Sequence, residues 1–317
     1  MAKTLIEVKH LKKYFPTPKG MLHAVDDVTF SIGQGQTMGV VGESGCGKST
    51  LGRTLIHLYE STDGQILFKG KDITHVGKRK LHELRKEMQI IFQDPFASLN
   101  PRMTVQETIM EPLELAGYHK SKLMDKTEEI MDMVGIDERL RHSYPHELDG
   151  GRRQRVGIGR ALALDPAFVV CDEPVSALDV SIQAQVLNLL QDLQAKSGVT
   201  YMFVTHDLSV VKHISDYICV MYLGQLVETT TSRELFAHPV HPYTKALLSA
   251  IPPVDIHHKR ERILLQGEIV SPVEPKPGCR FAARCPYATK QCQEPQQLRE
   301  IGKEHFVSCC RAEEIGG

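Results

Sequence analysis

The chain has 317 residues, of which 41% are hydrophobic and 24% are charged, and its formal net charge is -1. These values indicate a globular protein with room for one large domain and one small one, and they argue against a dedicated nucleic-acid-binding protein, which usually carries a strong basic excess. No apolar run in the sequence approaches the roughly 20 residues needed to cross a bilayer, and the first residues lack the apolar core of a signal peptide, so we expect a cytosolic chain that meets a membrane through a partner.

The first part of the chain combines predicted strands with one glycine-rich loop. Alternating or continuous apolar residues predict strands at residues 6–8, 25–30, 37–41, 65–68 and 88–92. The third of these leads directly into a glycine-rich stretch, residues 42–49, and the residues from Ser49 to Ile56 have helical spacing. Strand, glycine loop and helix in this order are the context in which a phosphate-binding loop is found.

The middle of the chain, residues 101–164, is predicted to be a helical insertion in an α/β core. Thr104 and Glu107 form a capping-box pattern at the start of one helix. A second helix is predicted over residues 121–134 and ends at Gly135.

The last predicted core strands lie at residues 168–171 and 199–204, on either side of a helical stretch at residues 181–195. This alternation predicts a mainly parallel sheet. The composition shifts after His238, becoming rich in proline and then in cysteine, so we place a domain boundary near residue 255. The predicted parts are a large domain at residues 1–255 and a small cysteine-rich extension at residues 256–317.

The glycine-rich stretch at residues 42–49 matches the phosphate-loop pattern G-x-x-x-x-G-K-[ST] without a mismatch. Its backbone amides must turn inward around phosphate oxygens, which requires glycine, and the next helix directs its positive end at the same anion. Lys48 is expected to reach the β- and γ-phosphates, and Ser49 to offer its hydroxyl to Mg²⁺. The predicted ATP-binding set is Tyr14, Gly42, Glu43, Ser44, Gly45, Cys46, Gly47, Lys48, Ser49 and Thr50.

Polar residues at the ends of three predicted strands supply the chemistry of hydrolysis. Asp172 is expected to reach Mg²⁺, and Glu173 beside it to polarise an attacking water. Gln93 is predicted to contact both Mg²⁺ and that water, and His206 to sense the γ-phosphate. Taken alone, an acidic pair is more often a solvated loop and a lone histidine more often structural; the phosphate loop upstream favours the catalytic interpretation.

Together these motifs resemble those of the ATP-binding subunits of ABC transporters, over residues 1 to about 250. Residues 42–49 are similar to the Walker A loop of that family, residues 168–173 to its Walker B strand, Gln93 to its Q-loop and His206 to its switch histidine. Tyr14 is similar to the residue that stacks on adenine, with Phe15 as a rival for that role. The segment similar to the D-loop is Ser176, Ala177, Leu178 and Asp179.

The resemblance implies a P-loop NTPase of α/β class with an ABC-type nucleotide-binding domain. In this fold a mainly parallel core sheet is accompanied by an antiparallel β subdomain and a helical subdomain, here about residues 101–164, and the cysteine-rich extension follows. ATP and Mg²⁺ are the implied ligands.

Residues 93–101 and 241–248 are similar to segments of the dipeptide/oligopeptide importer ATPases, a group that shares much of its pattern with nickel and glutathione importers. The implied function is to power import of di- or oligopeptides. The implied partners are a second, commonly different ATPase subunit, two transmembrane permease subunits that contact the loop from Gln93 to Arg102, and an extracytoplasmic solute-binding protein. This assembly would hold the chain at the cytoplasmic face of the cell membrane.

Two alternatives remain open at this point. One is an ATPase of a nickel or glutathione-type importer. The other is a non-transport ABC ATPase that acts on DNA or translation, although such proteins usually carry two ATPase cassettes or a basic surface, and this chain has one phosphate loop and a net charge of -1.

Residues 148–152 depart from the usual family signature, Leu-Ser-Gly-Gly-Gln. The residues expected to face the ATP bound by the partner subunit are Asp149, Gly150, Gly151 and Arg152. An ionised Asp149 cannot donate a hydrogen bond to a phosphate, and two like charges ~4 Å apart cost on the order of 4 kcal/mol at an effective dielectric near 20. Arg152 could offset this repulsion by pairing with Asp149 or with the phosphate. We therefore hypothesise that the partner's ATP is hydrolysed slowly or only bound.

Five of the eight cysteines lie in the last 40 residues. In a cytosolic chain this pattern predicts a metal site before it predicts disulfides. Zinc modules usually pair cysteines about two to four residues apart, which none of these are, and thiolate-only ligation with wide spacing also suits a [4Fe-4S] cluster. The importer resemblance points to the cluster, with zinc or no metal as the alternatives. The predicted ligands are Cys279, Cys285, Cys292, and Cys309 or Cys310. Cys46, Cys171 and Cys219 are expected to be buried as small apolar residues.

Overall fold

The computed structural model describes residues 3–251, 262–267 and 271–316. The domain boundary predicted near residue 255 lies outside these residues. The described residues fall into two compact units: the first is formed mainly by residues 33–36 and 76–202, and the second by residues 4–32, residues 37–75 and those from 203 onward.

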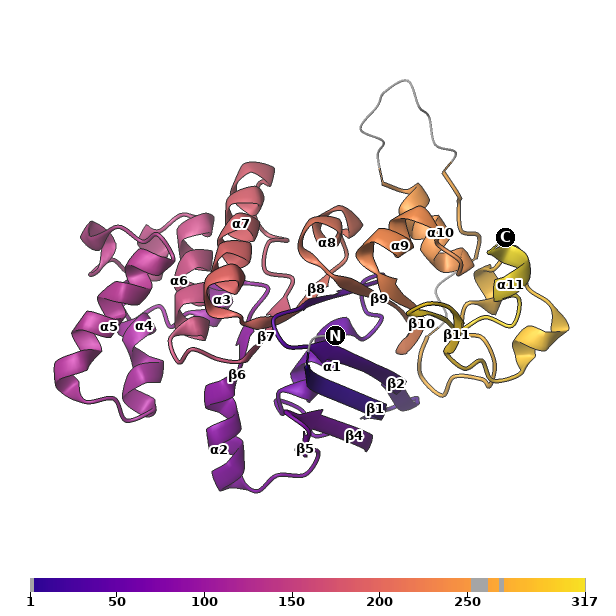
Figure 1. Ribbon diagram of the computed structural model, residues 1–317, viewed down its shortest axis with the longest axis horizontal. Helices are drawn as coiled ribbons and strands as arrows, with labels where there is room; N and C mark the ends of the chain where they lie inside the picture. The colour runs from indigo at the N-terminus through magenta and orange to yellow at the C-terminus, as the bar shows by residue number, and fades with distance from the viewer. Residues whose placement is uncertain (1–2, 252–261, 268–270, 317) are drawn as a thin grey trace. The chain divides into compact units, whose positions relative to one another are not determined.

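The second unit begins with an antiparallel sheet (Figure 1). Its strands lie in the order β2 (Gly20–Gly33), β1 (Thr4–Thr17), β4 (Asp63–Phe68) and β5 (Lys71–Asp72). In β1 and β4, Ile6 lies opposite Phe68 and Val8 opposite Ile66, and all four side chains are buried because alternate residues of a strand point to the same face. The predicted antiparallel β subdomain is confirmed.

The second unit also contains the strand that leads into the phosphate loop. This strand, β3 (Thr37–Val41), is fully buried and pairs in parallel with β9 (Tyr217–Tyr222). A two-residue turn then reverses the chain into β10 (Gln225–Thr231), which is antiparallel to β9. Leu223 and Gly224 in the turn both have positive φ, 43° and 87°, as this class of hairpin turn requires.

The cysteine-rich extension continues the same sheet. Strand β12 (His305–Val307) pairs with β10, and β11 (Arg299–Gly302) pairs with β12. The remaining helices of the unit are α1 (Lys48–Leu55), α8 (Leu208–Ile214), α9 (Ser232–Ala237), α10 (Pro242–Ser249), the 3-10 turns η3 (Ala282–Arg284) and η4 (Lys290–Gln293), and α11 (Ala312–Ile315).

A buried carboxylate fastens the extension to this sheet. Glu228 of β10 is completely buried and accepts hydrogen bonds from His305 Nε2 at 2.8 Å and from the backbone N–H groups of Val240 and His241, both at 2.9 Å. A buried charge is tolerated only when it is paired and hydrogen-bonded in this way. Val307 of the extension packs beside these groups against Val240.

In the first unit, β6 (Met88–Ile91) and β7 (Phe168–Asp172) pair in parallel, as the alternating pattern predicts. Strand β8 (Thr200–Thr205) begins in this unit and ends in the second. The remaining elements are α2 (Lys78–Glu87), α3 (Pro95–Ser98), α4 (Val105–Leu115), α5 (Lys120–Met133), η1 (Glu138–Leu140), η2 (Pro145–Glu147), α6 (Gly150–Leu162) and α7 (Val180–Ser197).

Helices α4, α5 and α6 pack against one another (Figure 1), which confirms the predicted helical insertion. The predicted capping box starts α4: Thr104 Oγ1 accepts the N–H of Glu107 at 3.3 Å, and the Glu107 carboxylate accepts the N–H of Thr104 at 2.8 Å. Among the described residues, none of the helices has the length and apolar character needed to cross a membrane.

Candidate nucleotide-binding site

The phosphate loop needs glycine at two positions where other parts of the backbone come close. A Cβ atom on Gly47 would lie 1.9 Å from the carbonyl oxygen of Ala24, and the φ of this residue is 105°. A Cβ atom on Gly42 would lie 2.1 Å from the carbonyl oxygen of Met221. Both distances are far inside van der Waals contact, so the loop fits against its neighbours only without these side chains.

Lys48 is buried within the loop. Its ammonium group donates to the carbonyl oxygens of Gly42 at 2.8 Å and Glu43 at 3.0 Å. Helix α1 begins at Lys48, so the partial positive charge of the helix start adds to that of the ammonium. The arrangement concentrates positive charge as the binding of phosphate requires.

Glu43 is held on its outer side by two residues that the sequence did not reveal. Its N–H donates to the hydroxyl of Tyr243 at 2.8 Å. Its carboxylate accepts two hydrogen bonds from the guanidinium of Arg284, at 2.8 and 3.2 Å. The hydrogen bond to Glu43 raises the pKa of Arg284 above its usual value. These partners lie 200 and 241 residues further along the chain, so no local motif could have identified them.

Tyr14 is half-buried in a polar network. Its ring stacks on that of His23, with centroids 3.9 Å apart, and its hydroxyl donates to Asp26. Burial, together with the hydrogen bond to Asp26, raises the pKa of Tyr14 well above its usual value, so the phenol stays neutral. The rival Phe15 is also half-buried and meets Tyr59 edge to face at 5.4 Å. The role of Tyr14 in adenine stacking stays a prediction.

The first unit brings two of the predicted hydrolytic residues together. Asp172 is buried at the end of β7, and Glu173 follows it with a φ of 47°. Residues other than glycine adopt this conformation uncommonly, and functional sites are one of the places where strained backbone conformations cluster. Gln93 Nε2 donates to Glu173 Oε2 at 2.9 Å, so these two side chains are already in contact.

The segment similar to a D-loop is held by the helix that follows it. Asp179 caps α7 by accepting the N–H of Ile182 at 3.0 Å. Gln183 Nε2 donates to the carbonyl oxygens of Val175 at 2.9 Å and Leu178 at 3.1 Å. Gln183 was missed because the predicted segment ends four residues before it.

In the second unit, His206 is exposed directly after β8. Asp207 beside it caps α8 by accepting the N–H of Ser209 at 2.7 Å. Of these two residues, Asp207 is a helix cap and His206 is exposed to solvent, so the role of His206 as a γ-phosphate sensor stays a prediction.

The structure accounts for the aspartate in the signature segment. Asp149 is the N-cap of α6 and accepts the N–H of Arg152 at 2.8 Å. Its other oxygen lies 3.4 Å from Nε of Arg152. The predicted pairing of these two residues is confirmed, and aspartate is among the best N-cap residues.

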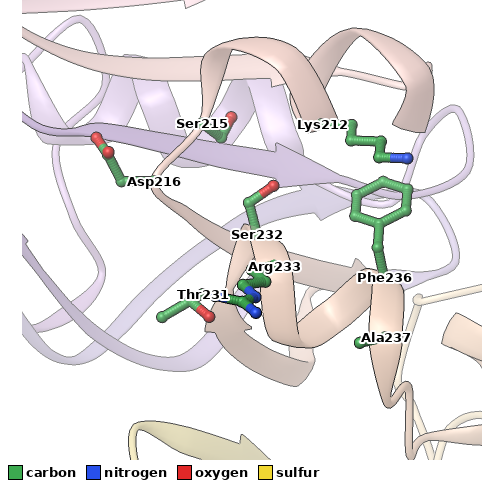
Figure 2. Close-up of a pocket in the computed structure, with 8 residues that line it drawn as sticks. All are labelled: Lys212, Ser215, Asp216, Thr231, Ser232, Arg233, Phe236 and Ala237. Carbon is green, nitrogen blue, oxygen red and sulfur yellow. The ribbon is translucent and has the colours of Figure 1, made fainter.

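The second unit also contains a surface hollow of about 640 Å³ that none of the predicted site residues lines (Figure 2). Lys212 Nζ lies over the Phe236 ring in this hollow, 5.2 Å from its centroid. Its lining consists of Lys212, Ser215, Asp216, Thr231, Ser232, Arg233, Phe236 and Ala237. The hollow is therefore distinct from the nucleotide-binding residues predicted from the sequence.

The predicted [4Fe-4S] or zinc site is not supported. In the parts of the chain that the structure describes, no group of three or more cysteine, histidine, aspartate or glutamate side chains is arranged to hold a metal ion. Cys292 and Cys310 have their sulfur atoms 3.9 Å apart, but Cys279, Cys285 and Cys309 do not complete a ligand set with them. The extension is instead fastened by strand pairing and by the Glu228–His305 contact.

The three cysteines of the large domain are buried, as predicted. Burial raises the pKa of Cys219 to about 12 and also raises the pKa values of Cys46 and Cys171. They therefore remain neutral thiols and pack as small apolar side chains.

Comparisons with known proteins agree with the nucleotide-binding motifs described above. Residues 25–176 match the family model for ABC transporters, and residues 227–292 match the model for the C-terminal region of oligopeptide/dipeptide transporters. The oligopeptide transport ATP-binding protein AppF of Bacillus subtilis (strain 168) is 51% identical over 318 residues, which cover 96% of this chain and 97% of that protein. The oligopeptide transport ATP-binding protein OppF of the same organism is 49% identical over 316 residues, which cover 99% and 98%.

Solved structures show the same fold. A dimeric bacterial ABC transporter cassette is similar with a TM-score of 0.67 and 27% identity, over 72% of this chain and 99% of that one. The cbiO1 protein of Clostridium perfringens, part of an ABC transporter complex, is similar with a TM-score of 0.67 and 26% identity, over 74% of this chain and 91% of that one.

Proposed function

Since the chain belongs to the family of ATP-binding subunits of oligopeptide ABC transporters, we propose that it hydrolyses ATP to power the import of di- or oligopeptides through a membrane transporter. One observation carries this proposal. The similarity to peptide-transport ATPases extends over 96% of the chain and includes the C-terminal region typical of that group, rather than only the phosphate-binding core.

The site geometry supports ATP as the substrate. Lys48 and the start of α1 would attract the triphosphate. The residues predicted to hold Mg²⁺ are Ser49, Gln93 and Asp172, whose oxygen atoms are the ligand type that this ion prefers; when bound, Mg²⁺ neutralises phosphate charge. Glu173 would accept the proton of the attacking water. Gln93, which donates a hydrogen bond to Glu173 at 2.9 Å, would help to orient that water.

Family members dimerise as cassettes and work with membrane permeases. We expect the permease to bind beside the loop that follows Gln93. Phe96 in this loop is 55% exposed, and the guanidinium of Arg153 lies 5.1 Å from the centroid of its ring. A hollow of about 490 Å³ next to the loop is lined by Phe92 and by Leu115, which is 72% exposed. The hollow has a mixed lining that also includes Arg85, Lys86 and Glu111, and an exposed aromatic ring beside such a surface is typical of a protein interface.

We also propose that the two ATP sites of the assembled dimer differ. Asp149 would face the ATP held by the second ATPase subunit, and its carboxylate is already engaged by the N–H and the side chain of Arg152. This pairing reduces the repulsion of a phosphate but supplies no hydroxyl donor. The Asp149→Ser variant should therefore raise hydrolysis at that site, which can be measured by trapping labelled nucleotide in each subunit. Equal trapping at both sites of the wild-type complex would contradict the asymmetry.

The decisive experiment uses the complete transporter in vesicles. This chain, its second ATPase subunit, the permeases and the solute-binding protein are reconstituted, and ATP hydrolysis is measured with peptide, nickel or glutathione. We expect stimulation by peptide, and a loss of about 100-fold or more with Glu173→Gln, because a general base contributes about 10²–10⁴ to the rate. Stimulation by nickel or glutathione alone would overturn the peptide assignment. Stimulation by nucleic acid without permeases would overturn the transport function.

The predicted metal cluster is no part of this proposal, because the cysteines among the described residues do not form a site that could hold one.

A further inference from the structure

The cysteine-rich extension reaches the nucleotide-binding residues through one short segment, residues 279–285. The segment begins and ends with a cysteine and carries two arginines, Arg280 and Arg284. Both guanidinium groups are buried, with side chains 6% and 9% exposed. Each pairs with an acidic residue more than 240 positions earlier in the chain.

Arg284 holds the phosphate loop. Two hydrogen bonds fix its guanidinium to the Glu43 carboxylate, and a third contact, at 3.4 Å, reaches the hydroxyl of Tyr222. The backbone carbonyl of Glu43 in turn accepts from Lys48. Arg284 is thus two contacts away from the cation expected to bind the γ-phosphate. It also neutralises an acidic residue in a loop that must bind an anion, since a Glu43 carboxylate without this partner would repel phosphate.

Arg280 holds the strand side of the same site. Its guanidinium donates to Asp26, which also accepts the hydroxyl of Tyr14, and to the carbonyl oxygen of Leu223. Leu223 lies in the β9–β10 turn, and the next residue, Gly224, donates its N–H to the carbonyl oxygen of Cys46 in the loop at 2.8 Å. The second arginine therefore contacts the turn that supports the loop directly, and the proposed adenine-stacking residue through Asp26.

Phe281 fixes the segment between these two arginines. It is 1% exposed, and its ring lies 5.3 Å from the ring of Tyr222 and 5.5 Å from that of Tyr243. Tyr243 is the residue that accepts the N–H of Glu43. A buried aromatic cluster of this kind stabilises one arrangement of its members, so the arginines cannot shift independently of the loop.

We propose that residues 279–285 of the extension are a positioning element of the nucleotide site: Arg284 fixes the phosphate loop through Glu43, and Arg280 fixes Tyr14 through Asp26, so the extension sets the affinity for ATP. This inference rests on the proposed ATPase function and names a control of that same site. The two arginines have different roles, because Arg284 contacts the loop that meets phosphates and Arg280 contacts Asp26, the partner of the residue expected to meet adenine.

The test measures binding of two probes, MgATP and magnesium inorganic triphosphate, to the full-length chain by titration calorimetry. Arg284→Gln should weaken both probes about tenfold, because it removes two hydrogen bonds between charged groups. Arg280→Gln should weaken MgATP about fivefold and triphosphate only about twofold, since its ion pair with Asp26 acts on the adenine side and its contact with Leu223 reaches the loop only through the β9–β10 turn. Arg311→Gln is the matched control: it lies in the same extension and pairs with Glu314 at its surface, so both probes should stay within about twofold of wild type.

Rescue separates positioning from mere stability. The Glu43→Gln/Arg284→Gln double variant removes the repelling carboxylate together with its partner, so it should bind triphosphate within about threefold of wild type. If Arg284→Gln lowers the melting temperature, Arg284→Lys replaces it in the test. Because it keeps the positive charge beside Glu43, it should bind triphosphate more tightly than Arg284→Gln does. In the assembled transporter, Arg284→Gln should raise KM for ATP and leave kcat within about twofold.

Three results would overturn the inference: Arg284→Gln binding both probes like wild type, Arg311→Gln losing as much affinity as Arg284→Gln, or a double variant no better than Arg284→Gln. A wild-type chain that binds neither probe would overturn the proposed function as well. If Lys48→Met weakens binding about 50-fold but Arg284→Gln leaves it unchanged, the inference alone is overturned.

Discussion

Two glycine-rich segments are expected to face the phosphates of ATP, and they are held in place by different means. The phosphate loop, residues 42–49, depends on partners far away in the sequence, since Glu43 is held by residues 200 and 241 positions later. The signature segment, residues 148–152, is the start of a helix and is held by Asp149 three residues before its partner. The phosphate loop is thus held mainly by residues distant in the sequence, whereas the helix start in the signature segment is capped by a residue of the segment itself.

We expect opposite outcomes for the same substitution in the phosphate loop and in the body of α6, the helix that begins in the signature segment. Gly47→Ala places a methyl group 1.9 Å from a backbone carbonyl and forces a residue with a Cβ to keep a φ of 105°. Because neither can be relieved without moving the loop, we expect MgATP binding to fall by more than about 100-fold. Titration calorimetry with MgATP measures this loss.

The matched control lies in α6, the helix that the signature segment begins. A Cβ on Gly157 would have no neighbouring atom within 4 Å, and alanine favours a helix over glycine by about 1 kcal/mol. Gly157→Ala should therefore unfold at an equal or higher denaturant concentration than wild type. If the Gly47→Ala variant bound MgATP as tightly as the wild type does, the loop would be less constrained than its contacts indicate.

The next largest effect is expected from the loop's own cation. Lys48→Met keeps the aliphatic stem but removes the ammonium group that donates to two loop carbonyls. A hydrogen bond that involves a charged group contributes about 1.5–3 kcal/mol, so losing the ammonium expected to bind phosphate should make MgATP bind about 50-fold more weakly. Lys245→Met removes a lysine of α10 that donates to the Ile315 carbonyl at 2.6 Å, and it should leave the affinity unchanged. Equal losses in both variants would mean that the effect is not specific to the loop.

Features that depend on nearby residues could be predicted from the sequence. The strand before the loop, the capping box of Thr104 and Glu107, and the pairing of Arg152 with Asp149 all involve residues at most a few positions apart. Their side chains meet because a helix or strand brings such neighbours together whatever the rest of the fold.

Features that depend on distant residues could not be predicted in this way. The contacts of Arg284 with Glu43 and of Arg280 with Asp26 form only when the extension folds against the rest of its unit. The cysteine spacing indicated a metal site in that extension, but strand pairing with β10 and the buried Glu228 hold it instead. A pattern of cysteines carries no information about how far apart the folded chain places them.

A pH experiment tests the long-range support of the loop. Burial lowers the pKa of His241 from its usual value near 6.5 to about 4. Its unprotonated Nδ1 accepts the N–H of Tyr243, which in turn holds Glu43. Between pH 6.5 and 4 the unfolded chain takes up a proton here and the folded chain does not, so stability is fully present above this window and falls with pH by at most about 1.4 kcal/mol per unit.

The His241→Asn variant isolates this contribution, because asparagine can accept the same hydrogen bond and does not titrate. Between pH 7 and pH 5, wild type should lose about 2 kcal/mol more of its free energy of unfolding than the variant does, as measured by urea denaturation. Parallel loss in the two proteins would assign the pH dependence to groups other than His241.

The smallest effect is expected in the signature segment, where a single side chain holds the helix start. Asp149→Ala removes the cap of α6 and should lower the free energy of unfolding by about 1 kcal/mol, whereas Asp149→Ser keeps a capping oxygen and should stay within about 0.5 kcal/mol of wild type. Urea denaturation of the three proteins at pH 7 measures both values. If Asp149→Ala matched wild type, the signature would be held by something other than its own cap, and the contrast with the phosphate loop would disappear. If serine restored what alanine lost, the cap would be a local property that the aspartate and the family's usual serine share, and only the chemistry offered to the partner's ATP would separate them.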